Sequence, residues 1–153
     1  DTTFDPWSFG GNATGLGSGT NKTYYGATQR LVVTSGSAGG TGPSLKCNGE
    51  LSKITSKVGL ITADELAYAG YAYAQNNTTT YLQENATDTY WWSLSPGGFG
   101  GGYAVVWRVD GSSGSFSHNS VGITFGVRPS ISLKSTTNVT GEGTSSSPYI
   151  ISM

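Results

Sequence analysis

Turn-forming residues recur so often along this chain that long regular helices and strands have little room. The 153 residues include 24 glycines, 21 serines and 20 threonines, and these 65 positions are spread from one end of the chain to the other. Glycine and serine clusters favour turns and disfavour helix interiors. The side chains that could form a core therefore lie in short segments between turns, which predicts a domain built mainly from short strands.

Aromatic side chains supply the apolar surface that a core needs. The chain carries 4 Trp, 9 Tyr and 5 Phe, although only 11% of its residues are charged. Its eight basic and nine acidic residues form no basic cluster, so we expect no nucleic-acid partner. No apolar run approaches the ~20 residues of a membrane helix, so we expect no membrane span in this chain. The polar start Asp1–Thr3 is typical of a mature protein without a signal peptide.

The chain divides into an arm and one domain. Residues 1–23 mix glycines with isolated aromatics and are expected to form an irregular N-terminal arm. Residues 24–153 show no internal linker and no fixed-period repeat, so we expect one domain there. Apolar runs predict strands at Arg30–Thr34 and Val58–Ile61.

One short helix is clearly marked. Thr62–Glu65 is a capping box, in which the Thr62 hydroxyl accepts from the Glu65 amide and the Glu65 carboxylate accepts from the Thr62 amide. Gly70 is placed to end the helix after about two turns. Asp64 and Glu65 point about 100° apart on a helix, so capping and the helix dipole explain them better than a catalytic carboxylate pair.

The second half is predicted to be a strongly twisted antiparallel sheet spanning residues 90–151. In Tyr90–Ser95, Trp92 and Leu94 share one face, which we take as the core face, and Pro96 ends the strand. The glycines of residues 97–102 form a hairpin loop, since no helix or phosphate-binding lysine accompanies them. Further strands are expected at Tyr103–Val109, within Val121–Leu133 and at Pro148–Ile151, with a turn at Asp110-Gly111.

Single copies of cysteine and histidine restrict the chemistry. Cys47 can form no intramolecular disulfide and no cysteine-based zinc site, and we expect it to be buried and reduced. His118 lies in Ser117–Ser120, which we predict to be a solvated loop tip without a partner motif for a catalytic triad. We therefore expect no catalytic residue, no metal site and no cofactor.

An ordered set of motifs resembles a family of surface proteins of Gram-positive and gut-associated bacteria. Members of this family are often pilin-like, and their tryptophan-rich half is similar to C-type-lectin-like domains. The resemblance implies an α+β fold: a single C-type-lectin-like domain of short antiparallel strands, one short helix and long Gly/Ser-rich loops. The motifs are Leu45–Cys47, Lys57–Glu65, Tyr90–Pro96, Val106–Val109, Gly126–Lys134, Gly141–Thr144 and Pro148–Ile150.

Three departures limit what the resemblance implies. The chain has no hydrophobic pilin helix at its start, so pilus assembly by that route is not implied. The Glu-Pro-Asn and Trp-Asn-Asp calcium motifs of sugar-binding lectins are missing, and only Asp110 and Glu142 supply carboxylates after Tyr90. The cysteine pair of the related formylglycine-generating enzymes is also missing.

These observations favour a non-enzymatic, calcium-independent extracellular domain for adhesion or ligand binding. Its partner would be a glycan or protein on a host or neighbouring cell. A structural subunit of a pilus-like or other extracellular filament, binding copies of itself, is the alternative. The candidate contacts are mostly aromatic residues on the loops flanking residues 103–109. Core packing is the alternative interpretation for most of these aromatic side chains, and for Trp107 the two interpretations are equally favoured. The candidate contacts are Phe99, Tyr103, Trp107, Phe116, His118 and Asn119.

Two further features have a structural and a functional interpretation. Arg128 could face a ligand, but an ion pair or carbonyl contact beneath the loops is favoured. Six Asn-X-Ser/Thr sequons are candidate glycosylation sites, although many such matches arise by chance in a threonine-rich chain. They start at Asn12, Asn21, Asn76, Asn77, Asn85 and Asn138.

Overall fold

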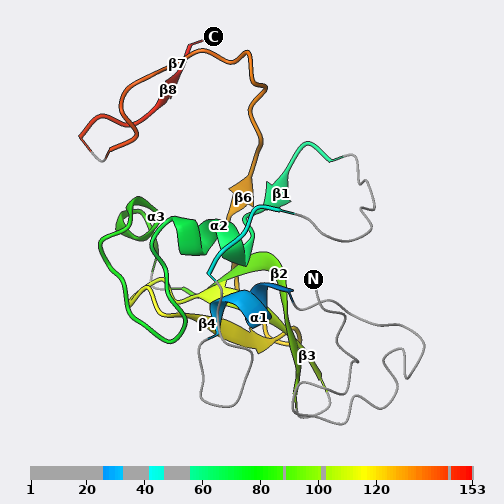
Figure 1. The fold of residues 1–153 in the computed structure, drawn as a ribbon. Coiled ribbons are helices and arrows are strands. Elements are labelled where there is room, and N and C mark those ends of the chain that lie inside the picture. The colour runs from blue at the N-terminus through cyan, green and yellow to red at the C-terminus, as the bar shows by residue number, and fades with distance from the viewer. Residues whose placement is uncertain are drawn as a thin grey trace.

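The computed structural model of the chain describes residues 26–32, 42–46, 56–87, 89–100, 103–144 and 146–152. The predicted arm, Cys47, Asn12 and Asn21 lie outside these ranges. The described part is an α+β fold of short helices and mostly short strands, which confirms the coarse prediction (Figure 1). The described helices are α1 (Gly26–Leu31), α2 (Ala63–Tyr68) and α3 (Tyr81–Glu84), so the expectation of a single helix was wrong.

A four-stranded sheet forms the centre of the fold. Its strand order is β4-β3-β2-β5, with β2 at Trp91–Gly100, β3 at Tyr103–Val109, β4 at Phe116–Ser120 and β5 at Gly126–Val127. β2 pairs antiparallel with β3, and β3 with β4, whereas β5 runs parallel to β2. The sheet is therefore mixed rather than wholly antiparallel, because the chain crosses from β4 to the opposite edge before forming β5.

Strand β2 continues through Pro96, which was predicted to end it. The pairing register with β3 shifts on both sides of Pro96, between Trp92 and Pro96 and again between Pro96 and Gly98. Proline is tolerated within a sheet at such irregularities, because the ladder does not need its missing N–H there. The predicted strand over residues 103–109 is confirmed as β3.

The core lies on one face of this sheet. Trp91 is 3% exposed, while Leu94, on the opposite face, is 59% exposed. The prediction that Trp92 and Leu94 face the core was therefore wrong. Ser93 and Ser95 are buried with Trp91, and the Ala63 amide donates to the Ser95 hydroxyl over 2.9 Å. Ser95 thus faces inward because its hydroxyl binds the start of α2.

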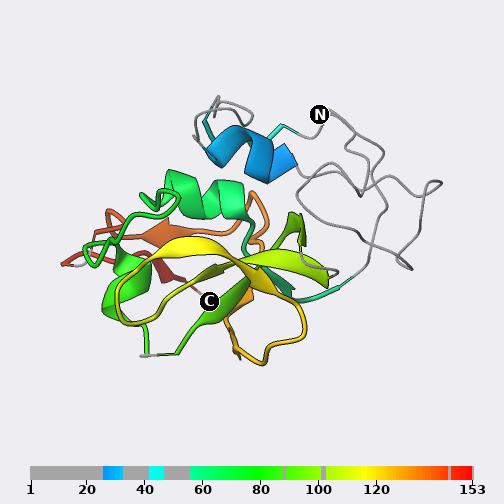
Figure 2. The ribbon, with the colours of Figure 1, turned by 90° about the horizontal axis from the view of Figure 1, so that it is seen from below.

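Helices α1 and α2 cover the core face, and Figure 2 shows both on the same side of the sheet. Helix α1 includes Arg30 and Leu31, so the start of the strand predicted at residues 30–34 was wrong, while residues 33 and 34 lie outside the described ranges. The helix is anchored by Thr28, whose hydroxyl donates to the Gly97 carbonyl (2.7 Å) and accepts from the Trp107 indole nitrogen (3.0 Å). These contacts come from distant parts of the chain and override the local preference for a strand.

Helix α2 confirms the sequence prediction. The Thr62 hydroxyl accepts from the Glu65 amide (3.2 Å), and a Glu65 carboxylate oxygen accepts from the Thr62 amide (2.7 Å). The helix ends at its C-cap Ala69, and Gly70 follows with a φ of 102°, which glycine adopts easily.

Two small strand pairs lie outside the central sheet. β1 (Gly59–Leu60) pairs with β6 (Pro129–Ser130), and β7 (Val139–Thr140) pairs with β8 (Ile150–Ile151). Figure 1 shows the β7–β8 hairpin standing well away from the central sheet. Pro148–Ile151 therefore contains a strand, as predicted, but not one that closes the main sheet.

Candidate functional site

Two of the predicted contact residues belong to the core. Trp107 and Phe116 are both 0% exposed, and their ring centroids lie 4.5 Å apart. Their interpretation as surface contacts was wrong, and the alternative of core packing for Trp107 is confirmed. The alternation of strand β3 explains the error, since Trp107 and Val109 share the inward face and Arg108 points outward.

His118 lies in strand β4 and not at a loop tip. Its ring stacks on Tyr73 with a centroid separation of 5.9 Å, and it meets the Trp107 ring edge-on at 5.7 Å. Burial, together with the positive charge of Arg108, lowers the pKa of His118 below its ordinary value. The imidazole is therefore neutral at pH 7 and packs as an aromatic ring.

The other predicted contacts stay accessible in part. Tyr103 begins β3 and is 52% exposed, and Asn119 in β4 is half-buried opposite Val106. The backbone of Phe99 pairs with Ala104, while its side chain lies outside the description. The five predicted residues whose side chains are described thus divide between buried and accessible positions and do not form one site.

A cluster that the sequence prediction missed lies on the sheet face opposite the core, which we call the outer face. Trp92, Arg108 and Ser117 are directly paired across β2, β3 and β4, so their side chains share this face. Phe125 packs on Trp92 and on Tyr90, with ring centroids 4.6 Å and 4.9 Å apart. We call Tyr90, Trp92 and Phe125 the aromatic cluster. All three rings are half-buried and so partly accessible.

Arg108 lies against this cluster. Its guanidinium carbon is 4.2 Å from the centroid of the Tyr90 ring, a cation–π distance. Its Nε and Nη1 atoms are buried and have no hydrogen-bond partner among the described residues. The outer face therefore combines three rings, a guanidinium with unused donors, and the polar side chains of Ser117 and Asn119.

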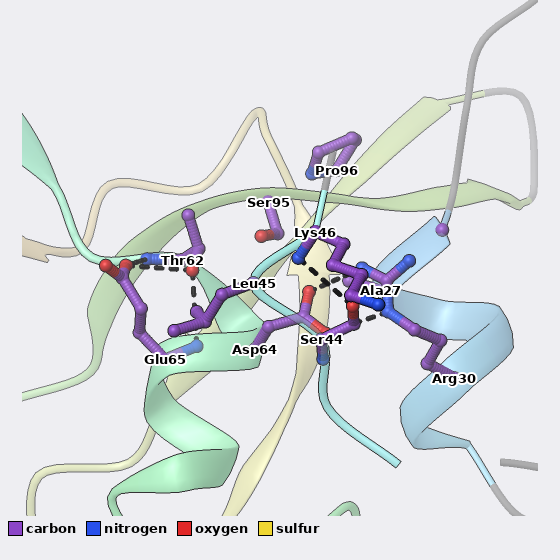
Figure 3. Close-up of a pocket in the computed structure, with 11 residues that line it drawn as sticks. Ala27, Arg30, Ser44, Leu45, Lys46, Thr62, Asp64, Glu65, Ser95 and Pro96 are labelled. Carbon is purple, nitrogen blue, oxygen red and sulfur yellow. Dashed lines mark hydrogen bonds and ion pairs between the residues drawn. The ribbon is translucent and has the colours of Figure 1, made fainter. Parts of the chain in front are cut away.

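A pocket of about 490 Å³ lies on the other side of the molecule, between α1, residues 44–46, the start of α2 and β2 (Figure 3). Arg30 donates from Nε and Nη2 to the two carboxylate oxygens of Asp64 over 2.9 and 2.7 Å. The Ser44 amide donates to the same carboxylate over 2.9 Å, and Asp64 is buried. Glu65 is engaged in the helix cap. Both carboxylates thus hold elements of the fold together.

Arg128 has the structural role favoured from the sequence. Its guanidinium donates to the backbone carbonyls of Leu82 and Asn85 and lies 4.8 Å from the Trp91 ring centroid. It therefore ties the segment around α3 to the sheet.

The described sequon asparagines differ in accessibility. Asn76, Asn85 and Asn138 are exposed, while Asn77 is half-buried. The Asn77 side-chain nitrogen donates to the Gly70 carbonyl over 2.8 Å, and its oxygen accepts from Thr79. A glycan on Asn77 would have to break these contacts. Glycosylation of Asn77 therefore conflicts with the fold more than glycosylation of Asn76, Asn85 or Asn138 would.

The described residues contain no group of three or more His, Cys, Asp or Glu side chains that could hold a metal ion. None of the described helices combines the length and the apolar composition that crossing a membrane requires. No family model, curated protein or solved structure matches the chain.

Proposed function

We propose that this chain is a non-enzymatic binding domain of the cell surface that recognises its partner through the outer face of the central sheet. The observation that carries the proposal is the aromatic cluster beside Arg108. Trp92 lies on β2, and Tyr90 and Phe125 lie directly before β2 and β5, so these partly exposed rings are held at the sheet and lose little conformational entropy when a ligand binds. The resemblance to bacterial surface proteins with C-type-lectin-like domains supports an extracellular location and an adhesive role.

Aromatic faces suit sugar rings and flat apolar side chains alike. Trp92 and Phe125 present two such faces at a tilt of 39°, and Ser117 and Asn119 offer a hydroxyl and an amide on the same face of the sheet. Glycans and hydroxyl-rich protein surfaces need this mixture of stacking and hydrogen bonding. A surface glycan or protein of a host or neighbouring cell is therefore the proposed partner.

The proposed binding needs neither catalysis nor calcium. His118, the one imidazole of the sequence, packs as a neutral ring. Asp110, one of two carboxylates after Tyr90, accepts hydrogen bonds from the hydroxyl and amide of Ser112, which stabilise the turn after β3. This use of its titratable groups supports a binding role over a chemical one.

The test is binding of the purified chain to arrays of glycans and cell-surface proteins, with and without a chelator. Trp92→Ala and Phe125→Ala should each lower affinity at least tenfold while the protein stays folded by circular dichroism. Tyr68→Ala is the matched control, because Tyr68 is an exposed aromatic on α2, across the core from the outer face. Equal binding by all variants, or binding that the chelator abolishes, would contradict the proposal.

A filament subunit is the second candidate, and the C-terminal region favours it. Large apolar side chains are exposed along this region, and no other described strand pairs with the outer edges of the β7–β8 hairpin, which could therefore pair with another copy. The exposed residues are Val127, Ile131, Leu133, Val139, Tyr149, Ile150 and Ile151.

Sedimentation and electron microscopy of the concentrated chain test this candidate. Assembly should be lost in a double variant, Ile150→Ser with Ile151→Ser, and kept in Trp92→Ala. A chain that stays monomeric at high concentration, or assembly that the hairpin variant leaves intact, would rule against it.

A further inference from the structure

We propose that Arg108 is a carboxylate-binding residue and that the ligand of the outer face is an acidic glycan, in which a sugar carboxylate pairs with this guanidinium. The inference rests on the proposed function and specifies its ligand class. It starts from a feature that the fold itself does not explain, namely a cation whose hydrogen-bond donors are removed from water and left unused.

The unpaired state of Arg108 is costly. A guanidinium stays charged at every physiological pH, and burying its donors without acceptors forfeits the hydrogen bonds that water would supply. Nε and Nη1 are both buried without a partner, and among the described residues no carboxylate forms an ion pair with Arg108. The Tyr90 ring at 4.2 Å offsets only part of that loss. Buried unsatisfied groups of this kind point to a missing partner.

The geometry of the guanidinium defines what that partner must offer. A guanidinium binds a carboxylate across one of two forks, Nε with Nη2 or Nη1 with Nη2. Either fork contains one of the two unpaired nitrogens. Because both atoms are buried in the free protein, the guanidinium must turn toward solvent for a carboxylate to reach a fork, and one unpaired nitrogen would then form a charge-assisted pair.

The surroundings of Arg108 favour a sugar acid over other carboxylates. Trp92 is its direct neighbour on β2 and Ser117 its direct neighbour on β4, so a ring and a hydroxyl flank the guanidinium on the same face. A pyranose ring can stack its C–H face on the tryptophan while its hydroxyls bond the serine. One guanidinium also matches one carboxylate per sugar better than the successive carboxylates of an acidic peptide.

A matched pair of probes separates charge from shape. Oligogalacturonate carries one carboxylate per ring, and its methyl ester keeps the ring and loses the charge. Isothermal titration of the purified chain should show at least tenfold tighter binding of the acid, weakening with added salt. Arg108→Gln should remove the preference for the acid, while Arg108→Lys should keep part of it. A poly-glutamate peptide forms the third arm.

Stability gives a second readout that does not depend on ligand choice. Because Nε and Nη1 of Arg108 have no hydrogen-bond partner in the described part of the chain, Arg108→Met should unfold at the same or a higher denaturant concentration than the parent chain. Arg30→Met is the control, and it should unfold earlier because it breaks the pair with buried Asp64.

The outcomes distinguish this inference from the function on which it rests. Equal affinity for the acid and the ester, or acid binding unchanged in Arg108→Gln, overturns the inference while leaving a neutral glycan partner in place. Binding of the poly-glutamate peptide in preference to the sugar acid overturns the glycan class. A marked loss of stability in Arg108→Met would show that the guanidinium already has a structural partner, and this also overturns the inference.

Discussion

Trp91 and Trp107 are both buried in the core, but only one of them has a hydrogen-bond partner. The Trp107 indole nitrogen donates to Thr28, whereas the buried Trp91 nitrogen has no hydrogen-bond partner within the described ranges. Replacing either tryptophan with phenylalanine removes a similar amount of buried ring surface. We expect Trp107→Phe to destabilise the protein by about 1 kcal/mol more than Trp91→Phe, since it alone breaks a hydrogen bond. Urea unfolding of the two variants measures the difference, and equal midpoints would contradict it.

His118 should make stability depend on pH. Burial lowers its pKa in the folded protein, so the unfolded chain binds a proton at higher pH than the folded chain does. The histidine's contribution is then fully present above its unfolded pKa of about 6.5 and is lost as the pH falls below that value.

The comparison with His118→Gln isolates this effect. The parent chain should lose more unfolding free energy than the variant between about pH 7 and pH 5, because only the parent must bury a group that prefers to be protonated. Parallel curves for the two proteins would show that His118 does not control this range.

At the scale of single elements, the cap of α2 provides a defined test. Thr62→Ala removes the side-chain acceptor for the Glu65 amide and should cost about 1 kcal/mol. Thr136→Ala, at an exposed turn position, is the control and should change stability by less than about 0.5 kcal/mol. Equal losses in both variants would argue against the cap as the cause.

Elements were predictable where local chemistry determines them. The capping box of α2 and the alternating run of β3 are both written within a few consecutive residues. Helix α1 was not predictable, because Thr28 finds its partners in β2 and β3 far along the chain. The inward face of β2 was assigned wrongly for a related reason. Hydrophobicity alone favoured Leu94, while the buried hydroxyl of Ser95 binds an amide of α2.

The candidate site was predictable only in part, because it too depends on contacts between distant parts of the chain. Aromatic residues on the second half were expected to form the contacts, yet Trp107 and Phe116 pack inside. The alternation of β3 places Arg108 opposite Trp107, and this phase alone could have suggested an outward arginine. Its proximity to Tyr90, and the packing of Phe125 on the same cluster, depend on loop conformations that no local pattern specifies.

At the scale of the whole molecule, the C-terminal hairpin should be dispensable for the core. Among the described residues from 131 onward none is buried, and β7 and β8 pair only with each other. A chain ending at residue 133 should therefore unfold cooperatively at nearly the parent's urea midpoint. Phe116→Ala, by contrast, should lose about 3–5 kcal/mol. A truncated chain without a cooperative transition would show that the hairpin supports the fold.

The anchoring of α1 by Thr28 also affects the order of events during synthesis. The two partners of the threonine hydroxyl follow it by 69 and 79 residues. At ~5–20 residues per second, a ribosome would deliver Trp107 roughly 4 to 16 s after Thr28. A six-residue helix is too short to persist by itself over that interval. The residues of α1 must therefore wait without stable helical structure until β3 has been made.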